Sequence, residues 1–197
     1  FFTPSHEVLF NDYLKPSAEI EYDVNFLFYK NQICESAEFS KGGWRETQYN
    51  KVLYWIEAIK ENREKIIVCC DVDVQFLKPS FESLNKSLGS SDIAFQCNDS
   101  SGNICSGFFI CRCNQRTLSF FEKTAFLLKG KMHQDGGGEQ YVMRDIIFKR
   151  LCELSWSIIP RSTVWCPGFK YNSLSELKIN NNAVIHHANW TNGIEEK

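Results

Sequence analysis

Two aspartates separated by one residue are the clearest sign of chemistry in this sequence. Asp71 and Asp73 follow directly after the apolar run Ile66–Cys70, which is typical of a strand buried on both faces, as in a parallel sheet. Alternate side chains of an extended backbone point to the same side, so the two carboxylates would repel each other there. Mg²⁺ or Mn²⁺ would bind both acids and keep positions open for a diphosphate. The other interpretation is a pair of exposed loop acids that cap the next turn.

A glycine-rich stretch later in the chain carries the remaining acids suited to catalysis. Three consecutive glycines, residues 136–138, stand between Asp135 and Glu139. Such a segment could close over a substrate, and it permits a helix that begins at Glu139 with its anion-favouring N–H groups. One of these two acids could remove the proton from an acceptor hydroxyl, and another could stabilise a positively charged reaction centre. A solvated loop acid is the competing interpretation for Asp135.

Strands and helices alternate along the early part of the chain, which predicts an α/β sheet with helices on both faces. Apolar residues at helical spacing predict a helix over 45–62, just before the two aspartates. Other helices are expected over 6–14, 80–88, 117–128 and 139–151, and strands over 1–4, 24–29, 93–95, 107–111, 157–159 and 183–185. No repeat or long linker divides the chain, so we expect one domain over 1–197.

The composition excludes several classes of protein. The 197 residues are 43% hydrophobic and carry a formal net charge of −2, which fits a globular domain and argues against nucleic acid as the partner. No apolar run approaches the roughly 20 residues of a membrane helix. The nine cysteines include no CxxC pair, which argues against structural zinc and favours reduced thiols in the cytoplasm. Because the first residue is Phe1 rather than Met, we expect further residues upstream.

The stretch Ile66–Leu77 resembles the DxD strand of nucleotide-diphospho-sugar transferases with the GT-A fold. Four more segments resemble motifs of that family and stand in its order: Lys51 on the preceding helix, Ser106–Phe109 as the "S-G-F-F" strand, Glu139–Gln140 as the "DQ" pair, and His186–Lys197 as the "H-x-N…G…K" element. Together they span nearly the whole chain. The sequence departs from the family at Glu139, where Asp is usual, and at Ser106, where Asn is common.

The resemblance implies a Rossmann-like GT-A fold with a mixed, mainly parallel sheet, and it implies a set of ligands. Asp73 would bind the metal, Asp71 would contact the ribose or the metal, and His187, favoured over His186, would complete the set. The other donor-binding residues would be Thr3, Pro4, Ser5, Lys51, Val72, Ser106, Gly107, Gln140 and Lys197. A helix cap remains the alternative for Ser5, a solvated helix face for Lys51 and a frayed terminus for Lys197.

The resemblance also implies an activity. A sugar would move from a nucleotide-diphosphate donor, with a UDP-sugar favoured, to a hydroxyl of a glycan or glycoprotein, with Mn²⁺ or Mg²⁺ as cofactor. Residues 1–100 would form the nucleotide-binding half, and 101–197 the acceptor and catalytic half. Two other functions stay open: a metal-dependent nucleotidyl or phosphoryl transferase, and a non-catalytic nucleotide-sugar-binding module. The compact chain also resembles virus-encoded or bacterial members that build surface glycans, and a viral member would work in the host cytoplasm.

Overall fold

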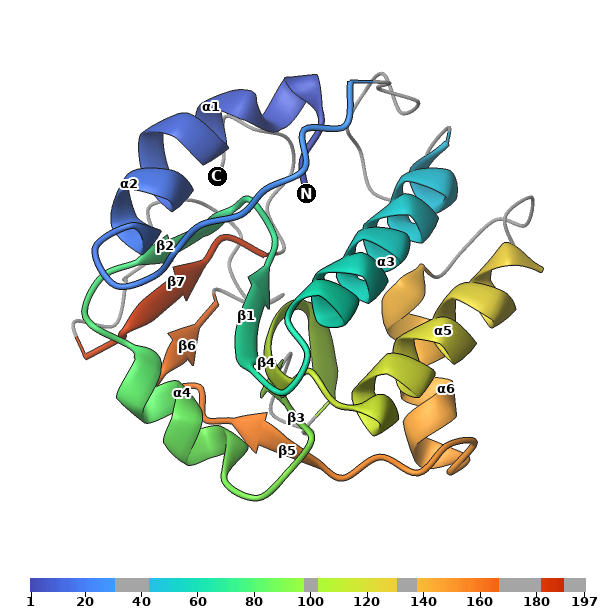
Figure 1. The fold of residues 1–197 in the computed structure, drawn as a ribbon. Coiled ribbons are helices and arrows are strands. Elements are labelled where there is room, and N and C mark those ends of the chain that lie inside the picture. The colour runs from blue at the N-terminus through green and yellow to red at the C-terminus, as the bar shows by residue number, and fades with distance from the viewer. Residues whose placement is uncertain (31–42, 98–102, 131–137, 167–181, 190–197) are drawn as a thin grey trace.

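Two β-sheets form the frame of the protein, whose computed structural model describes residues 1–30, 43–97, 103–130, 138–166 and 182–189 (Figure 1). The larger sheet has the strand order β1-β4-β3-β5, with β1 at Ile66–Cys70, β3 at Ile93–Cys97, β4 at Ile104–Arg112 and β5 at Trp156–Ile159. The smaller sheet has the order β2-β7-β6, with β2 at Val74–Phe76, β6 at Val164–Trp165 and β7 at Ile185–His187.

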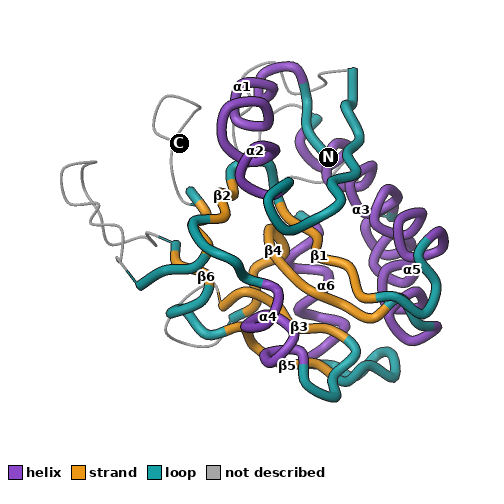
Figure 2. Tube along the Cα trace, turned by 60° about the vertical axis from the view of Figure 1, so that its left-hand side comes forward, coloured by secondary structure: helices purple, strands orange, loops and turns teal. Residues whose placement is uncertain are grey.

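Helices cover both faces of the larger sheet, as the sequence predicted. One face carries α3 (Trp44–Glu61), α5 (Gln115–Lys129) and α6 (Glu139–Phe148). The other face carries the smaller sheet, α4 (Phe81–Leu88) and an N-terminal helical segment. That segment consists of a 3-10 turn (Pro4–His6), α1 (Glu7–Leu9), a π-helical turn (Phe10–Leu14) and α2 (Lys15–Ala18). Figure 2 shows α3 and α5 on the opposite side of the larger sheet from β2 and β6.

Strand β4 divides the hydrophobic core because its side chains alternate between two clusters. Phe109 and Cys111 pack with α3, α5 and α6, whereas Phe108 and Ile110 pack with the smaller sheet and the N-terminal segment. All four side chains are fully buried. Trp55 of α3 meets Phe109 edge-on, with ring centroids 5.1 Å apart, a favourable geometry for aromatic pairs. The strand at the centre of the molecule is therefore held firmly from both sides.

The mixed α/β architecture is confirmed, but the strand directions correct one expectation. Among the described strands, β1–β4, β3–β4 and β2–β7 pair antiparallel, and only β3–β5 and β6–β7 pair parallel. The apolar run in β1 has a different cause from parallel pairing. Ile67 and Cys69 pack on one cluster, and Ile66, Val68 and Cys70 pack on the other. A strand covered on both faces needs apolar residues on both, whatever the direction of its neighbour.

The N-terminal residues differ from the expectation of two short strands at 1–4 and 24–29. The structure has a single parallel bridge between Phe2 and Phe28. The N–H of Phe2 donates to the carbonyl of Leu27 at 3.1 Å, and the N–H of Tyr29 donates to the carbonyl of Phe2 at 2.8 Å. The helical segment then starts at Pro4, so Ser5 lies inside its first turn instead of capping it.

Asp92 ties the start of β3 to two other elements. Its carboxylate accepts hydrogen bonds from Asn114 at 2.7 Å and from the Arg116 guanidinium at 2.9 Å, both at the beginning of α5. It also accepts from the N–H and the hydroxyl of Ser155, just before β5, at 2.9 and 2.7 Å. The residue is 1% exposed, and a buried carboxylate is stable only when its oxygens are bonded in this way. Asp92 is therefore a structural anchor, distant from the acidic pair in sequence.

The described cysteines are free thiols. Burial raises the pKa of Cys70 to about 12, which keeps this thiol neutral beside the acidic loop. Within the described ranges, no helix has both the length and the apolar character needed to cross a bilayer.

Candidate active site

The two predicted aspartates lie where the two sheets meet, on the loop between β1 and β2. Asp71 continues β1, and its N–H donates to the carbonyl of Gly107 on β4 at 2.7 Å. Asp73 precedes β2, and its carbonyl accepts from the N–H of Ala188, directly after β7, at 2.9 Å. In the antiparallel register, His187 of β7 stands opposite the first residue of β2. The loop thus attaches one acid to each sheet, and the register brings a histidine beside the second acid.

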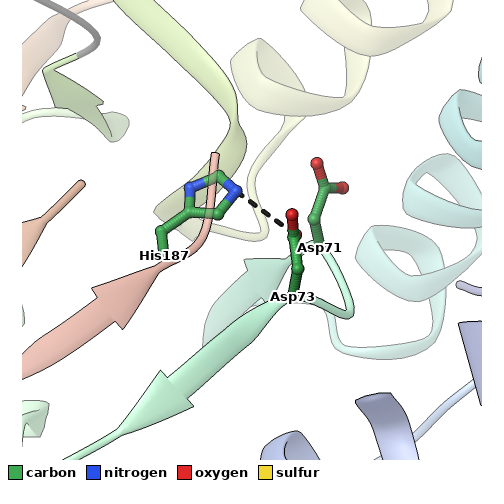
Figure 3. A group of neighbouring side chains, drawn as sticks. All are labelled: Asp71, Asp73 and His187. Atoms are coloured by element: carbon green, nitrogen blue, oxygen red, sulfur yellow. Dashed lines mark ion pairs between the residues drawn. The ribbon is translucent and has the colours of Figure 1, made fainter. Parts of the chain in front are cut away.

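Asp71, Asp73 and His187 converge on one point (Figure 3). Each offers a ligand atom within 4.8 Å of the others, and Nε2 of His187 lies 3.4 Å from Oδ1 of Asp73. The side chains of His187 and Asp73 are 2% and 7% exposed, whereas that of Asp71 is 31% exposed and forms the open side of the group. His186 packs instead on the ring of Trp165, with centroids 5.3 Å apart. The structure therefore brings His187, not His186, to the acids.

Gly107 makes room for this convergence. A Cβ atom at this position would lie 2.5 Å from Cε1 of His187 and 2.7 Å from Oδ2 of Asp71. Carbon atoms in contact normally stay about 3.5 Å apart, so a residue with any side chain would push one or both groups away. The sequence motif around Gly107 thus has a steric explanation: the acid and the histidine approach the backbone of β4 from two sides.

Strand β4 is irregular at the same place. Along β3, Phe95 pairs with Phe109, but the next residue, Gln96, pairs with Cys105. The β4 residues in between, Ser106–Phe108, therefore form a bulge. Bulges are common next to functional sites because they redirect side chains and backbone groups. Here the bulge turns β4 toward the beginning of α6.

A buried lysine links the acidic pair to α6. Nζ of Lys51 on α3 lies 3.0 Å from Oδ1 of Asp71 and 2.7 Å from Oε1 of Glu139, the first residue of α6. The hydroxyl of Ser106 donates to the same Glu139 oxygen at 2.8 Å, and the Ser106 N–H donates to Oε1 of Gln140 at 3.1 Å. The Lys51 and Glu139 side chains are only 7% and 4% exposed. Residues from four predicted segments are thus joined in one bonded group.

The charges in this group shift the pKa values of its members. Burial acts to raise the pKa of Asp71, but the attraction and hydrogen bond of Lys51, with the nearby His187, outweigh it and lower that pKa. Burial acts to lower the pKa of Lys51, but Asp71 and Glu139 together raise it, so the ammonium stays charged. Burial also acts to lower the pKa of His187, and the adjacent Asp73 carboxylate reverses this and raises it well above the usual range. Asp71 is therefore ionised at neutral pH.

These residues fit a divalent cation. Two carboxylates and one imidazole nitrogen lie close enough to share one ion, and Lys51 contributes one positive charge beside Asp71. The proton held between His187 and Asp73 would be released when a cation takes the Nε2 lone pair. Carboxylate oxygens with one imidazole suit Mn²⁺ better than Mg²⁺, since Mg²⁺ is bound mainly by oxygen.

The remaining predicted residues lie in different surroundings. Val72 is buried in the cluster on the smaller sheet's side, so its side chain faces the core. Thr3, Pro4 and Ser5 form the first helical turn, where the hydroxyls of Thr3 and Ser5 are 3.3 Å apart. Two further predicted residues, Asp135 and Lys197, lie outside the described residues.

The sequence reasoning missed Gln96. This residue is fully buried on β3, and its Oε1 lies 2.6 Å from Nδ1 of His187. The predicted strand covered only 93–95, so it did not include the polar residue that follows. The available signal was a glutamine between Phe95 and Cys97, inside an otherwise apolar run. The sequence reasoning also gave no role to Asn189, whose amide nitrogen lies 3.4 Å from the sulfur of Cys105 on β4.

Comparison with known proteins assigns the family. The nucleotide-diphospho-sugar transferase family matches residues 33–197, and the chain belongs to this family. The protein is therefore a glycosyltransferase, and no helix spans a membrane within the described residues. A nucleotide-sugar donor and a glycan acceptor follow from the family. A comparison with curated protein sequences finds no match.

Two solved structures resemble the chain. A glycosyltransferase involved in the glycosylation of the major capsid of PBCV-1 is 14% identical, with a TM-score of 0.57, over 85% of this chain and 78% of that one. Mouse xyloside xylosyltransferase 1, in its apo form, is 13% identical with a TM-score of 0.48, over 96% of this chain and 74% of that one. The first likeness shows that the chain has the GT-A fold of such transferases.

Proposed function

We propose that this protein transfers a sugar from a nucleotide-diphosphate donor, with a UDP-sugar favoured, to a hydroxyl of a glycan or glycoprotein, using Mn²⁺ or Mg²⁺. One observation supports the metal dependence. In a chain of the nucleotide-diphospho-sugar transferase family, Asp71, Asp73 and His187 bring three ligand atoms within 4.8 Å of one another. The bound ion would neutralise negative charge on the diphosphate leaving group.

The neighbouring residues would hold the donor in place. Lys51 adds a fixed positive charge beside Asp71, which favours an anionic donor without the conformational freedom of an exposed lysine. The bulge at Ser106 and Gly107 keeps the backbone of β4 close to the acids. Gln140 accepts from the N–H of Ser106 and so fixes the first turn of α6 against this bulge. Both halves of the chain, 1–100 and 101–197, contribute to the proposed donor site.

The structure favours a positioning role for Glu139 over proton removal. Its Oε1 already accepts from Lys51 and from the Ser106 hydroxyl, and the side chain is 4% exposed. A carboxylate bonded in this way is not open to an acceptor hydroxyl in solution. Asp135 stays the sequence-based candidate for the general base.

The experiment is a panel of nucleotide sugars incubated with Mn²⁺, with Mg²⁺ or with a chelator. We expect one donor to be hydrolysed slowly, and transferred to a glycan acceptor faster, only when a divalent ion is present. Asp73→Ala should remove the metal-dependent turnover because the ligand set loses a carboxylate. Asp145→Ala, which removes an exposed acid that pairs with Lys149 at 2.9 Å, is the matched control and should retain activity.

The products separate this function from its alternatives. With a nucleotide sugar as the substrate, a glycosyltransferase breaks the anomeric C–O bond and releases a nucleoside diphosphate, whereas transfer of the nucleotidyl group would break the P–O–P bond and release a sugar 1-phosphate. A phosphoryl transferase would leave the nucleotide sugar intact and would need a nucleoside triphosphate as its donor. A binding module would take up the donor without any hydrolysis. Turnover that is unchanged in Asp73→Ala would show that the assigned ligands are wrong.

A further inference from the structure

We propose that Gln96 is a positioning residue that fixes His187 in the tautomer able to bind a metal ion. This inference rests on the proposed function, since it concerns a ligand of the proposed metal site. Its basis is the contact between Oε1 of Gln96 and Nδ1 of His187, which are 2.6 Å apart and belong to two fully or almost fully buried residues. Gln96 lies on β3 of the larger sheet, and His187 lies on β7 of the smaller one.

The chemistry of the two side chains sets the direction of this hydrogen bond. The amide oxygen of Gln96 only accepts, so Nδ1 of His187 must carry the proton. A neutral imidazole carries one proton, and Nε2 is then left with a free lone pair. That nitrogen is the atom that faces Oδ1 of Asp73 at 3.4 Å. Metal-bound histidines commonly donate their second ring N–H to an oxygen in this way.

The opposite orientation of the amide would disable the site. If Nε2 of Gln96 faced the ring, it would donate to Nδ1 of His187, and the ring proton would have to sit on the imidazole Nε2. That nitrogen would then donate to Asp73 and could not bind an ion. The orientation of one buried amide therefore decides whether His187 is a ligand.

A second observation argues against a purely structural reason for Gln96. Its Nε2 atom is buried and makes no hydrogen bond of normal geometry with the residues that the structure describes, and the Cys166 thiol near this amide is only a weak acceptor. An unsatisfied buried donor is unfavourable, and an apolar side chain of similar size would avoid it. Packing alone would thus favour leucine at this position in β3. The glutamine is explained by the oxygen that it presents to His187.

The location of Gln96 fits this role. It stands opposite Cys105, at the edge of the bulge that contains Ser106 and Gly107. The bulge brings the β4 backbone close to Cε1 of the His187 ring, as the 2.5 Å approach of a hypothetical Gly107 Cβ to that atom shows. The glycine limits where the ring lies, and the glutamine fixes which of its nitrogens carries the proton.

The test compares two substitutions at this position in the full chain, with Mn²⁺ alone as the probe in calorimetry. Gln96→Leu removes the acceptor, and we expect the Kd for Mn²⁺ to rise about 10- to 100-fold. Gln96→Glu keeps an oxygen that accepts from Nδ1–H, so its Kd should stay close to that of the wild type. Gln75→Leu is the matched control, because Gln75 stands opposite His186 in the same pair of strands. Its Kd should not change.

NMR of nitrogen-15-labelled histidine shows which ring nitrogen of His187 carries the proton, which an activity assay cannot show. With Mg²⁺ bound, we expect the wild-type His187 to be protonated on Nδ1 and not on Nε2, and Gln96→Leu to lose this preference. The Tm of Gln96→Leu should stay within about 4 °C of the wild type, because the substitution removes a poorly satisfied amide donor while it leaves the Nδ1–H of His187 without its acceptor. A merely structural role would lower the Tm and leave the ring protonation unchanged.

Two results would overturn the proposal. One is a Gln96→Leu variant that binds Mn²⁺ as tightly as the wild type, when the wild type is seen to hydrolyse a donor with Mn²⁺. That result would refute the role of Gln96 and leave the proposed function intact. The other is a neutral wild-type His187 that carries its proton on Nε2 and not on Nδ1. If the wild type itself binds neither Mn²⁺ nor a donor, the metal site fails, and this inference fails with it.

Discussion

Replacing Gly107 by alanine tests whether the backbone of β4 really sets the geometry of the proposed metal site. The added Cβ would lie 2.5 Å from Cε1 of His187 and 2.7 Å from Oδ2 of Asp71. A normal contact distance is about 3.5 Å, so the ring or the backbone must move by about 1 Å. Overpacking of this kind typically costs about 1–3 kcal/mol of unfolding free energy.

Metal binding should weaken together with stability, and by a comparable free energy. A shift of about 1 Å separates the ligand atoms of His187 and Asp71, which now lie within 4.8 Å of each other. We expect Gly107→Ala to weaken Mn²⁺ binding by about 10- to 100-fold, the range seen when the support of a ligand is lost. Calorimetry with Mn²⁺ measures the affinity, and urea unfolding measures the stability of the same sample.

Gly130→Ala is the control for adding a methyl group at a glycine. A Cβ at Gly130 would come no closer than 3.7 Å to the carbonyl of Leu127, an ordinary contact, so stability and Mn²⁺ affinity should both stay near wild type. The steric reasoning is refuted if Gly107→Ala binds Mn²⁺ as the wild type does and loses no more stability than Gly130→Ala.

Two further substitutions test the buried charges. Lys51→Met should reduce the unfolding free energy by about 3–5 kcal/mol, because it leaves the Asp71 and Glu139 carboxylates unneutralised side by side. In urea unfolding, the exposed Lys60→Met should cost about 0–0.5 kcal/mol, and an equal cost at the two lysines would contradict the assignment. Asp92→Asn should cost about 3 kcal/mol, because the bonds from Arg116, Asn114 and Ser155 lose their charged acceptor, while Asp145→Asn should be nearly neutral. Burial acts to raise the pKa of Asp92, but these hydrogen bonds outweigh it and lower the pKa from 3.8 to about 2. The stabilisation is therefore present above pH 3.8 and is lost as the pH falls toward 2, so urea midpoints measured across this range should fall less in Asp92→Asn than in the wild type.

Local sequence patterns were sufficient to predict individual strands and helices. The apolar run before Asp71 predicted a strand, and the helical spacing before it predicted α3, which the structure places at Trp44–Glu61. The order of motifs was sufficient to identify the family that matches residues 33–197. It also selected Lys51 and Glu139, which the structure joins at 2.7 Å. Helix periods and strand ends are set by neighbouring residues, so one sequence reveals them.

The sequence contained no local pattern that reveals which distant strands pair, or in which direction. The run Ile66–Cys70 is apolar because both its faces are covered, and this pattern is the same for a parallel or an antiparallel neighbour. The last strand was expected at 183–185 but lies at Ile185–His187, because its register is set by pairing with β2. The role of Gln96 depends on a contact 91 residues away in sequence. Such contacts follow from how the sheets pack, which residue types alone do not specify.

The geometry of the acidic pair is consequently a property of two sheets and not of the loop that carries it. Asp71 is bonded to β4 of the larger sheet, and Asp73 is bonded to the residue after β7 of the smaller one. The two sheets meet through Phe76 on β2 and Phe108 on β4, whose ring centroids are 6.2 Å apart. Phe108 is fully buried and directly follows Gly107, so any change in how the sheets pack alters the distance between the two carboxylates. The contact between Phe76 and Phe108 therefore helps to set the spacing of the ligand atoms. The tightly packed core behind the loop keeps these three atoms together before any ion binds.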